Sequence, residues 1–367
     1  MDSVKRNVWC LLGLPFDAID METTIQRIHD SARDRTPCFI STPNLNFLIA
    51  SQKDTAFKGS VINSDMSVAD GKPLVWLARL LGMPIPERVA GSDLIEALIE
   101  NKKGYRQLKV FFFGGQEGIA QLACEKLNAQ EKGLRCVGFH NPGFGSIEDM
   151  SAESVIDEIN QSGADFVIVS LGAKKGQAWI EHNRAKLDAP IISHLGAVVN
   201  FIAGNVNRSP KLLQNLGLEW LWRIKEEPSL WKRYFGDGIV FIYLLLTRMI
   251  PYAITQSLHN DHGKNLQIDT INDDVSKIII SLKGGISQDK SFLLDQHLQL
   301  TPTIRSVYID INELEYFDAS FMGHIQIMEK ILEKKSIALR VFASSYQRKM
   351  FAYNSCSYLL DHGDNLA

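Results

Sequence analysis

The residue types that could do chemistry in this chain gather in two short stretches between residues 61 and 94. In the first, Asp70 and Gly71 follow an apolar run, and in the second, Arg88 precedes Gly91 and Asp93. A carboxylate at the end of a buried strand, followed by glycine and a helix, occupies the place where α/β proteins bind ligands. An arginine nearby can bind a phosphate group through its planar fork of donors. Together these residues predict an enzyme that transfers a group activated by phosphate.

The elements that must position these residues alternate between strand and helix over the first two hundred residues. Apolar runs predict strands at 39–42, 66–69, 110–113, 135–139, 166–171 and 191–195. Helical patterns lie between them at 46–56, 72–81, 92–101, 117–130 and 178–187. This alternation predicts a mostly parallel sheet with helices on both faces.

The pattern changes after residue 207. A segment rich in tryptophan and basic residues, 216–235, is followed by an apolar run at 239–246. The run is shorter than the ~20 residues that a membrane-spanning helix needs. It therefore predicts either a buried helix or a membrane-surface element. The second interpretation is supported by the basic residues around the run, which are Lys211, Arg223, Lys225, Lys232, Arg233 and Arg248.

The last hundred residues repeat the α/β pattern on a smaller scale, after a polar stretch that predicts a linker. Strands are expected at 277–282, 306–311 and 337–342, helices at 288–300 and 321–334, and a turn at Gly284 and Gly285. The sequence thus divides into a catalytic core at 1–207, an appendage at 208–256, a linker at 257–274 and a second domain at 275–367.

Composition excludes several classes of protein. A length of 367 residues allows two domains, and a net charge of -3 gives no sign of nucleic-acid binding. The five cysteines include no C-x-x-C pair, which favours reduced thiols in a cytosol over a disulfide scaffold or a zinc site. Pro15 and Asp17 interrupt the N-terminal apolar run, so no signal peptide is expected. No His, Asp and Glu cluster has metal-ligand spacing, so no metal and no cofactor are expected.

An ordered set of motifs resembles the WecG/TagA/CpsF glycosyltransferase family over the first two thirds of the chain. The motifs are Ser41–Asn44, Ala69–Gly71, Glu87–Asp93, Gly114–Gly115, Ser193–Ala197 and Gly217–Arg223. The resemblance implies a Rossmann-like, metal-independent, inverting enzyme at the cytoplasmic face of a bacterial plasma membrane. It implies a UDP-sugar donor of the N-acetylmannosamine, mannosaminuronic acid or glucose type. The implied acceptor is a saccharide on polyprenyl diphosphate.

The resemblance also implies a role for each motif. Asp70 would be the base that deprotonates the acceptor hydroxyl, and Arg88 would neutralise the leaving diphosphate. Substrate contacts would come from Thr42, Asn44, Gly71, Gly91 and Asp93. From the residues alone, Asp70 and Gly71 also suit a turn, Asn44 a helix cap, and Arg88 a solvated surface charge.

Three further features bear on the substrate site. Many family members have Pro-Lys-Gln-Glu where this chain has Lys174–Gln177, so Gly176 falls on the sugar-contacting glutamine and Gln177, one residue on, is the expected substitute. Arg223 and Arg233 match two appendage arginines that reach the active site in membrane-bound relatives, and Leu230 replaces a third. The turn at Gly114–Gly118 suits either phosphate binding or tight helix–strand packing.

Residues 315–323 resemble the signature of the STAS domain (sulfate transporter and anti-sigma factor antagonist). Ser320 matches the serine that is phosphorylated in that family, at a helix start that could hold a phosphate. Ala319 and Phe321 depart from the family pattern, and a helix-capping role for Ser320 is the alternative. The domain is expected to fold alone, to bind a protein partner and to be dispensable for chemistry.

The sequence therefore predicts a peripheral membrane glycosyltransferase, and homo-oligomerisation stays open. One alternative is a sugar-nucleotide-binding adaptor that signals through Ser320, against which the retained Asp70 and Arg88 argue. Another is a nicotinamide-dependent oxidoreductase, against which the incomplete glycine fingerprint argues.

Overall fold

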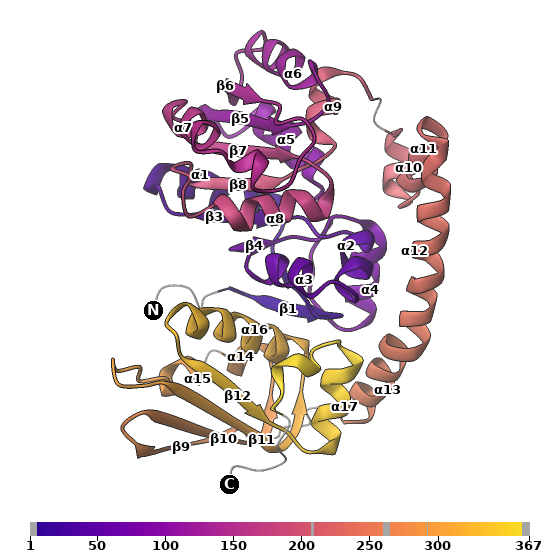
Figure 1. The fold of residues 1–367 in the computed structure, drawn as a ribbon. Coiled ribbons are helices and arrows are strands. Elements are labelled where there is room, and N and C mark those ends of the chain that lie inside the picture. The colour runs from indigo at the N-terminus through magenta and orange to yellow at the C-terminus, as the bar shows by residue number, and fades with distance from the viewer. Residues whose placement is uncertain (1–5, 207–208, 260–264, 292, 362–367) are drawn as a thin grey trace.

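Two β-sheets and a long helical arm build the chain, which the computed structural model describes over residues 6–206, 209–259, 265–291 and 293–361 (Figure 1). The larger sheet has six parallel strands in the order β4-β3-β8-β7-β5-β6. Its strands are β3 Cys38–Ser41, β4 Met66–Ser67, β5 Leu108–Gly114, β6 Leu134–His140, β7 Phe166–Ser170 and β8 Ile191–His194. The predicted parallel α/β class is confirmed.

Helices cover both faces of this sheet because successive strand residues point in opposite directions. In β5, Val110 and Phe112 pack against α1, α5, α6 and α9, whereas Phe111 and Phe113 pack against α7 and α8. The core helices are α1 Met21–Asp34, α2 Leu45–Ser51, α3 Thr55–Ile62, α4 Lys72–Leu80, α5 Gly91–Glu100, α6 Ile119–Asn128, α7 Glu153–Gln161, α8 Ala173–Asn183 and α9 Val198–Ala203.

One predicted helix, 46–56, is in fact two helices. The Asp54 side chain accepts a hydrogen bond from the Phe57 amide at 2.9 Å, which caps a new helix, α3, after α2 has ended. A capping signal inside an apolar pattern therefore overrides the periodicity.

An antiparallel hairpin at the N-terminus was not predicted. Strands β1 Val8–Leu11 and β2 Leu14–Asp17 are joined by Leu12 and Gly13, which both have positive φ. Every residue of the hairpin is buried, because it lies between the core and the second domain (Figure 1).

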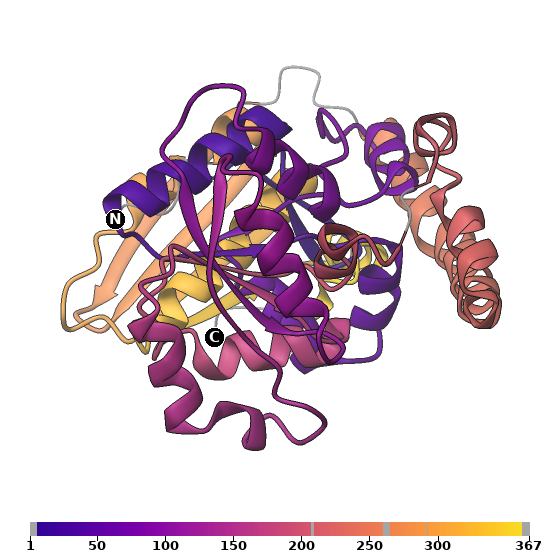
Figure 2. The same cartoon turned by 90° about the horizontal axis from the view of Figure 1, so that it is seen from above.

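The helical arm runs along one side of the molecule in both views (Figures 1 and 2). It comprises α10 Lys211–Asn215, α11 Glu219–Glu226, α12 Trp231–Leu244, a π-helical turn Leu245–Met249 and α13 Ile250–Leu258. Within the 31 residues of Pro228–Leu258, an 18-residue window is apolar enough for a membrane span, by length and composition alone. Only 17% of that window is buried, so the prediction of a buried helix is wrong, and the run at 239–246 lies within a longer helical segment.

The second domain has a four-stranded sheet in the order β12-β11-β10-β9, in which only β9 is antiparallel to its neighbour. Its strands are β9 Gln267–Asp274, β10 Lys277–Ile286, β11 Ser306–Phe317 and β12 Ala338–Phe342. Its helices are α14 Gln288–Ser291, α15 Leu293–His297, α16 Ala319–Lys334 and α17 Ser345–Tyr353.

Three predictions for this region need correction. Residues 267–274 form strand β9, so the linker interpretation is wrong there, and residues 260–264 lie outside the described residues. Gly284 and Gly285 lie within β10 at an irregularity in its register with β11, not in a turn. The expected helix at 288–300 is replaced by α14 and α15, which are both short.

The second domain is joined to the core by a shared apolar interior. Apolar residues of the β1–β2 hairpin belong to the same buried cluster as those of β10, β11 and α16. Polar contacts add to this: Asn354 donates to Cys10 O at 2.8 Å and accepts from the Leu12 amide at 2.6 Å. Lys330 of α16 bonds Asp65 at 3.1 Å. The two units are packed together, not only tethered by a linker.

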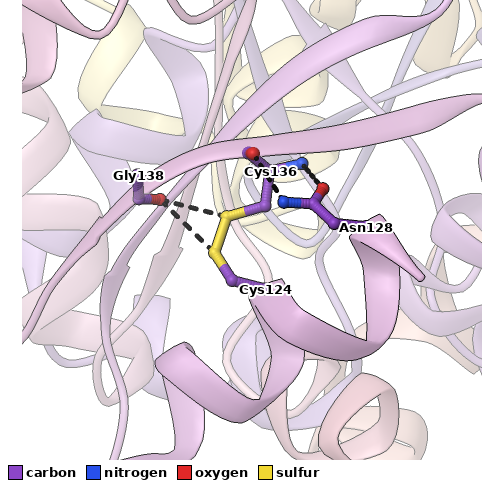
Figure 3. The surroundings of a disulfide bond; sticks show 4 residues. All are labelled: Cys124, Asn128, Cys136 and Gly138. Carbon is purple, nitrogen blue, oxygen red and sulfur yellow. Dashed lines mark hydrogen bonds between the residues drawn. A yellow bond between two sulfur atoms is a disulfide. The ribbon is translucent and has the colours of Figure 1, made fainter. Parts of the chain in front are cut away.

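One pair of cysteines departs from the expectation of reduced thiols. Cys124 of α6 and Cys136 of β6 form a disulfide, with their Cα atoms 5.2 Å apart (Figure 3). Asn128 supports the site by bonding the backbone of Cys136 at both its amide (2.8 Å) and its carbonyl (3.1 Å). Cys10, Cys38 and Cys356 are free and buried.

The shared interface generates a test of stability. A Cβ atom on Gly323 of α16 would lie 2.5 Å from the carbonyl oxygen of Val8, so Gly323→Ala must push the second domain from the hairpin. We expect a loss of ~1–3 kcal/mol in the free energy of unfolding, measured by urea titration.

The matched control is Gly59→Ala within α3, where an added Cβ meets nothing within 4 Å. There the change should be neutral or stabilising by about 0.5–1 kcal/mol, since alanine favours a helix over glycine. Equal effects of the two substitutions would contradict the close packing.

Candidate active site

Asp70 lies just past β4, where backbone hydrogen bonds tie together the loops that follow two neighbouring strands. The Asp70 amide donates to Pro43 O at 2.9 Å, and the Val68 amide donates to Ser41 O at 3.0 Å. These bonds bring the loop of Thr42 and Asn44 beside Asp70 at the carboxyl edge of the sheet. The structure therefore assembles the first two predicted motifs at the edge where parallel sheets bind ligands.

Gly71 makes the transition from Asp70 into helix α4. It precedes the helix with φ +150° and ψ 130°, a backbone conformation that residues other than glycine rarely adopt. Pro73 in the first turn then suits the start of the helix. The Asp-Gly pair is thus a turn, and this turn lies at the sheet edge where the site is predicted.

Burial raises the pKa of the Asp70 carboxyl from 3.8 to about 6. The positive charges of Arg88 and Arg223 lower this pKa, and the negative charges of Glu219 and Asp93 raise it again. A carboxylate with a pKa near the working pH is suited to accept a proton from a hydroxyl group.

Arg88 connects the core to the arm. Its guanidinium bonds Asp93, in the first turn of α5, and Glu219, at the start of α11. Its side chain is 11% exposed, whereas those of Asp93 and Glu219 are 25% and 34% exposed, so the arginine is enclosed and its two partners keep some contact with water. The solvated surface charge that the sequence alone allowed is therefore not what Arg88 is.

Glu219 was not predicted as a site residue, although it lies inside the Gly217–Arg223 motif. Its position in that motif was the sequence feature that could have identified it as a site residue. A glutamate at a helix start, however, also commonly stabilises the helix dipole. Its pairing with Arg88 depends on the arm returning to the core, which local sequence does not show.

A cavity of about 360 Å³ opens beside this cluster, between α9 and the arm. Its lining combines an aromatic ring, amides and charges, and includes Asn200, Asn205, Gln214, Glu219, Trp222 and Arg223. Such a lining can stack a sugar ring and bond its hydroxyl groups.

The remaining predicted residues differ in burial and in the contacts that they make. Thr42 is buried, and Asn44 caps α2 by accepting from the Phe47 amide at 3.1 Å. Gly91 begins α5, and a Cβ there would lie 2.7 Å from the Leu195 side chain. Arg233 lies exposed on α12, with its guanidinium 5.1 Å from the centre of the Tyr234 ring. It is not among the charges that act on Asp70.

Gln177 lies beneath the strand ends and is 1% exposed. Its Nε2 donates to Ser41 Oγ at 3.0 Å, whereas its Oε1 has no hydrogen-bond partner within the described part of the chain. A buried acceptor without a partner is costly and is satisfied by a ligand or a water molecule.

The glycine turn after β5 has a structural explanation. The Gly115 amide donates to Ser170 O at 2.8 Å, and a Cβ on Gly114 would lie 2.9 Å from the same oxygen. This close approach of β5 to the end of β7 favours the packing interpretation over phosphate binding.

Ser320 is 4% exposed, and its hydroxyl donates to Asp318, which caps α16. These contacts favour the helix-start role of Ser320 over that of a phosphorylation site. Among the described residues, no three His, Cys, Asp or Glu side chains group as metal ligands could.

Comparisons with known proteins identify a family and two similar enzymes. The model of the family "Glycosyl transferase WecG/TagA/CpsF family" matches residues 9–253. Two relatives are both named N-acetylglucosaminyldiphosphoundecaprenol N-acetyl-beta-D-mannosaminyltransferase. The one from Bacillus spizizenii is 26% identical over 220 residues, covering 59% of this chain and 83% of the relative. The one from Bacillus subtilis is 27% identical over 229 residues, covering 62% and 86%.

The raised pKa of Asp70 predicts a pH-dependent stability. Between the ordinary pKa of 3.8 and the native pKa of about 6, the folded state holds a proton that the unfolded state has released. The contribution of Asp70 to stability therefore falls as the pH rises through this window and stays low above it. An asparagine side chain has no such proton, so Asp70→Asn should gain stability relative to the wild type from about pH 4 to about pH 7.

Urea titration of both proteins across this range measures the effect, with the exposed Asp188→Asn as the control. A constant difference between Asp70→Asn and the wild type would show that the pKa of Asp70 is not raised.

Proposed function

This chain belongs to the WecG/TagA/CpsF family of glycosyltransferases, and we propose that it elongates a polyprenyl-diphosphate-linked saccharide in bacterial cell-surface polysaccharide synthesis. The donor is a UDP-sugar of the N-acetylmannosamine, mannosaminuronic acid or glucose type. The observation that carries the proposal is the Asp70 carboxyl at the sheet edge, with a pKa of about 6 and with Arg88 and Arg223 acting on it.

The proposed reaction is a single displacement with inversion at the anomeric carbon. Asp70 takes the proton of the acceptor hydroxyl while that oxygen forms a bond to the anomeric carbon. The bond from this carbon to the diphosphate oxygen breaks, and UDP leaves with the electron pair. Arg88 and Arg223 neutralise the charge that develops on the diphosphate.

The donor is proposed to lie over the strand ends, where Thr42, Asn44 and Gly71 line the approach to Asp70. Gln177 supports the loop beneath this position, because its Nε2 donates to Ser41 Oγ, next to Thr42. Arg88 is paired with Asp93 and Glu219 in this structure, so a bound diphosphate must compete with Glu219 or share the guanidinium with it.

Metal independence follows as a proposal, since arginines are assigned the charge neutralisation that Mg²⁺ provides elsewhere. Turnover should continue in excess EDTA, and a loss that Mg²⁺ restores would contradict this assignment.

The enzyme is proposed to lie on the inner face of the plasma membrane through the arm. Exposed apolar residues recur every three or four positions along it and form the apolar stripe, defined as Trp231, Phe235, Ile239, Ile242, Tyr243, Leu246, Ile250, Ile254 and Leu258. The opposite face is occupied: Met249 and Tyr252 are buried, and Asp237 accepts from Asn46 of α2 at 3.0 Å. A helix packed on one face and apolar on the other lies in the membrane surface and does not cross it.

The resemblance of the second domain to STAS domains stays a proposal, because the matched residues end at 253. A protein partner of that domain would be revealed by capture with the full chain. Equal capture by Ser320→Asp and the wild type would exclude a phosphoserine switch.

Substitution of the proposed base tests the reaction. Asp70→Asn keeps the shape of the side chain but cannot accept a proton, so we expect turnover to fall ~10²-fold or more while donor binding is kept. Transfer of labelled sugar from a panel of UDP-sugars to a polyprenyl-diphosphate-linked acceptor measures turnover, and thermal shift measures donor binding. Wild-type turnover by Asp70→Asn, with Asp188→Asn as the exposed control, would remove Asp70 from the mechanism.

Substitution of the apolar stripe tests membrane binding. A variant with Phe235→Ser, Ile239→Ser and Leu246→Ser should lose at least ~10-fold in binding to phosphatidylglycerol vesicles, because each exposed side chain contributes apolar area to the membrane contact. The control is Phe144→Ser, an exposed apolar residue of the core far along the chain from the stripe. Unchanged sedimentation of the triple variant with vesicles would contradict the membrane role.

A further inference from the structure

Three parts of the chain meet at one serine of the second domain. Ser355 lies just after α17, and its hydroxyl donates to Gln52 Oε1 in the core at 2.8 Å. The hydroxyl oxygen of Ser355 also accepts a hydrogen bond from Arg248 Nη1 in the arm, at 3.0 Å. Arg248 also donates to Ala352 O at 2.7 Å. We call these side chains, Gln52, Arg248 and Ser355, the junction.

The backbone of Ser355 is unusual for its residue type. Its φ of +57° lies in the left-handed region, where glycine or asparagine is the ordinary choice. The two hydrogen bonds of its hydroxyl, to Gln52 and from Arg248, are the contacts that hold a serine in this strained conformation.

The core side of the junction leads to the proposed donor site. Gln52 follows the last residue of α2, and its Nε2 donates to Leu48 O at 3.1 Å and to Leu12 O at 2.8 Å. The other end of α2 is capped by Asn44, in the loop beside Asp70. The junction therefore contacts the helix that begins at the substrate edge of the sheet.

The arm side of the junction leads to the charged cluster. Arg248 lies in the π-helical turn, and beyond it α13 is docked on the second domain, where Gln256 donates to Phe317 O at 2.7 Å. In the other direction α12 extends for 14 residues, or ~20 Å, towards α11, which carries Glu219 and Arg223. A small rotation at the π-helical turn is amplified along this length, so the displacement of α11 is larger than that of residues near the turn.

We propose that the second domain is a positioning element of the active site: the junction fixes the arm relative to α2, so that α11 delivers Glu219 to Arg88 and Arg223 to the neighbourhood of Asp70. Ser355 and Arg248 are positioning residues and touch no substrate. This role differs from the dispensable module that the sequence predicted. It rests on the proposed function only for its activity readout.

The test uses full-length variants that keep the backbone. Ser355→Gly removes the hydroxyl and suits φ +57° better than serine does, so its fold is kept. Arg248→Ala removes the other partner, and Arg248→Lys restores a donor. Lys349→Ala, which removes an exposed charge from the same helix α17, is the control.

The first readout is amide hydrogen exchange in residues 219–226. We expect faster exchange there in Ser355→Gly and Arg248→Ala, but not in Lys349→Ala, because the arm loses its fixed end. Wild-type exchange in this segment in both junction variants overturns the proposal.

The second readout is turnover. We expect kcat to fall about 3- to 30-fold in Ser355→Gly and Arg248→Ala with a smaller change in KM for the donor, and Arg248→Lys to recover part of it. Added to Arg223→Ala, Ser355→Gly should cost less than it costs alone, because both act through Arg223. Fully additive effects overturn the proposal. A wild-type enzyme without transferase activity refutes the proposed function instead, and the exchange experiment still decides the junction.

Discussion

The site depends on Arg88, which lies between two carboxylates that come from different parts of the chain. Arg88 bonds Asp93 of the core and Glu219 of the arm, and it is 11% exposed. Removing Arg88 from this set would leave two carboxylates without their counter-charge, which is costly. The pair with Glu219 links α11 of the arm to the core, and the same arrangement places Arg223 close enough to influence Asp70.

Because Glu219 belongs to the arm, its pair with Arg88 requires that the rest of the arm also be fixed against the protein. Asp237 ties the middle of α12 to α2, and the second domain holds the far end through the π-helical turn and α13. The arm is thus fixed along the side that faces the protein, and its opposite side keeps the apolar stripe for a membrane. One face of the arm packs against the protein and the other is exposed, which explains how a long apolar segment can be both packed and exposed.

Sequence patterns predicted what depends on local physics. Buried strands such as Phe166–Ser170 appear as apolar runs, and the glycine after Asp70 marks a conformation that only glycine adopts easily. What the patterns did not show depends on distant contacts. The β1–β2 hairpin has no polar face because both of its sides are covered, and strand β9 is polar in sequence because it is an edge strand. Glu219 acquires its role only when the arm folds back, and the second domain appeared independent because its interface with the hairpin has no sequence signature.

In the proposed reaction, Asp70 acts as a base in a single displacement that Arg88 and Arg223 assist. The most direct measurement is the anomeric configuration of the transferred sugar, determined by NMR of the product made from a donor labelled with ¹³C at the anomeric carbon. We expect a configuration opposite to that of the donor, because the acceptor oxygen attacks from the side away from the leaving diphosphate. Retention of the donor configuration would contradict the proposed reaction, since a double displacement requires a nucleophile in the place that this reaction gives to the acceptor.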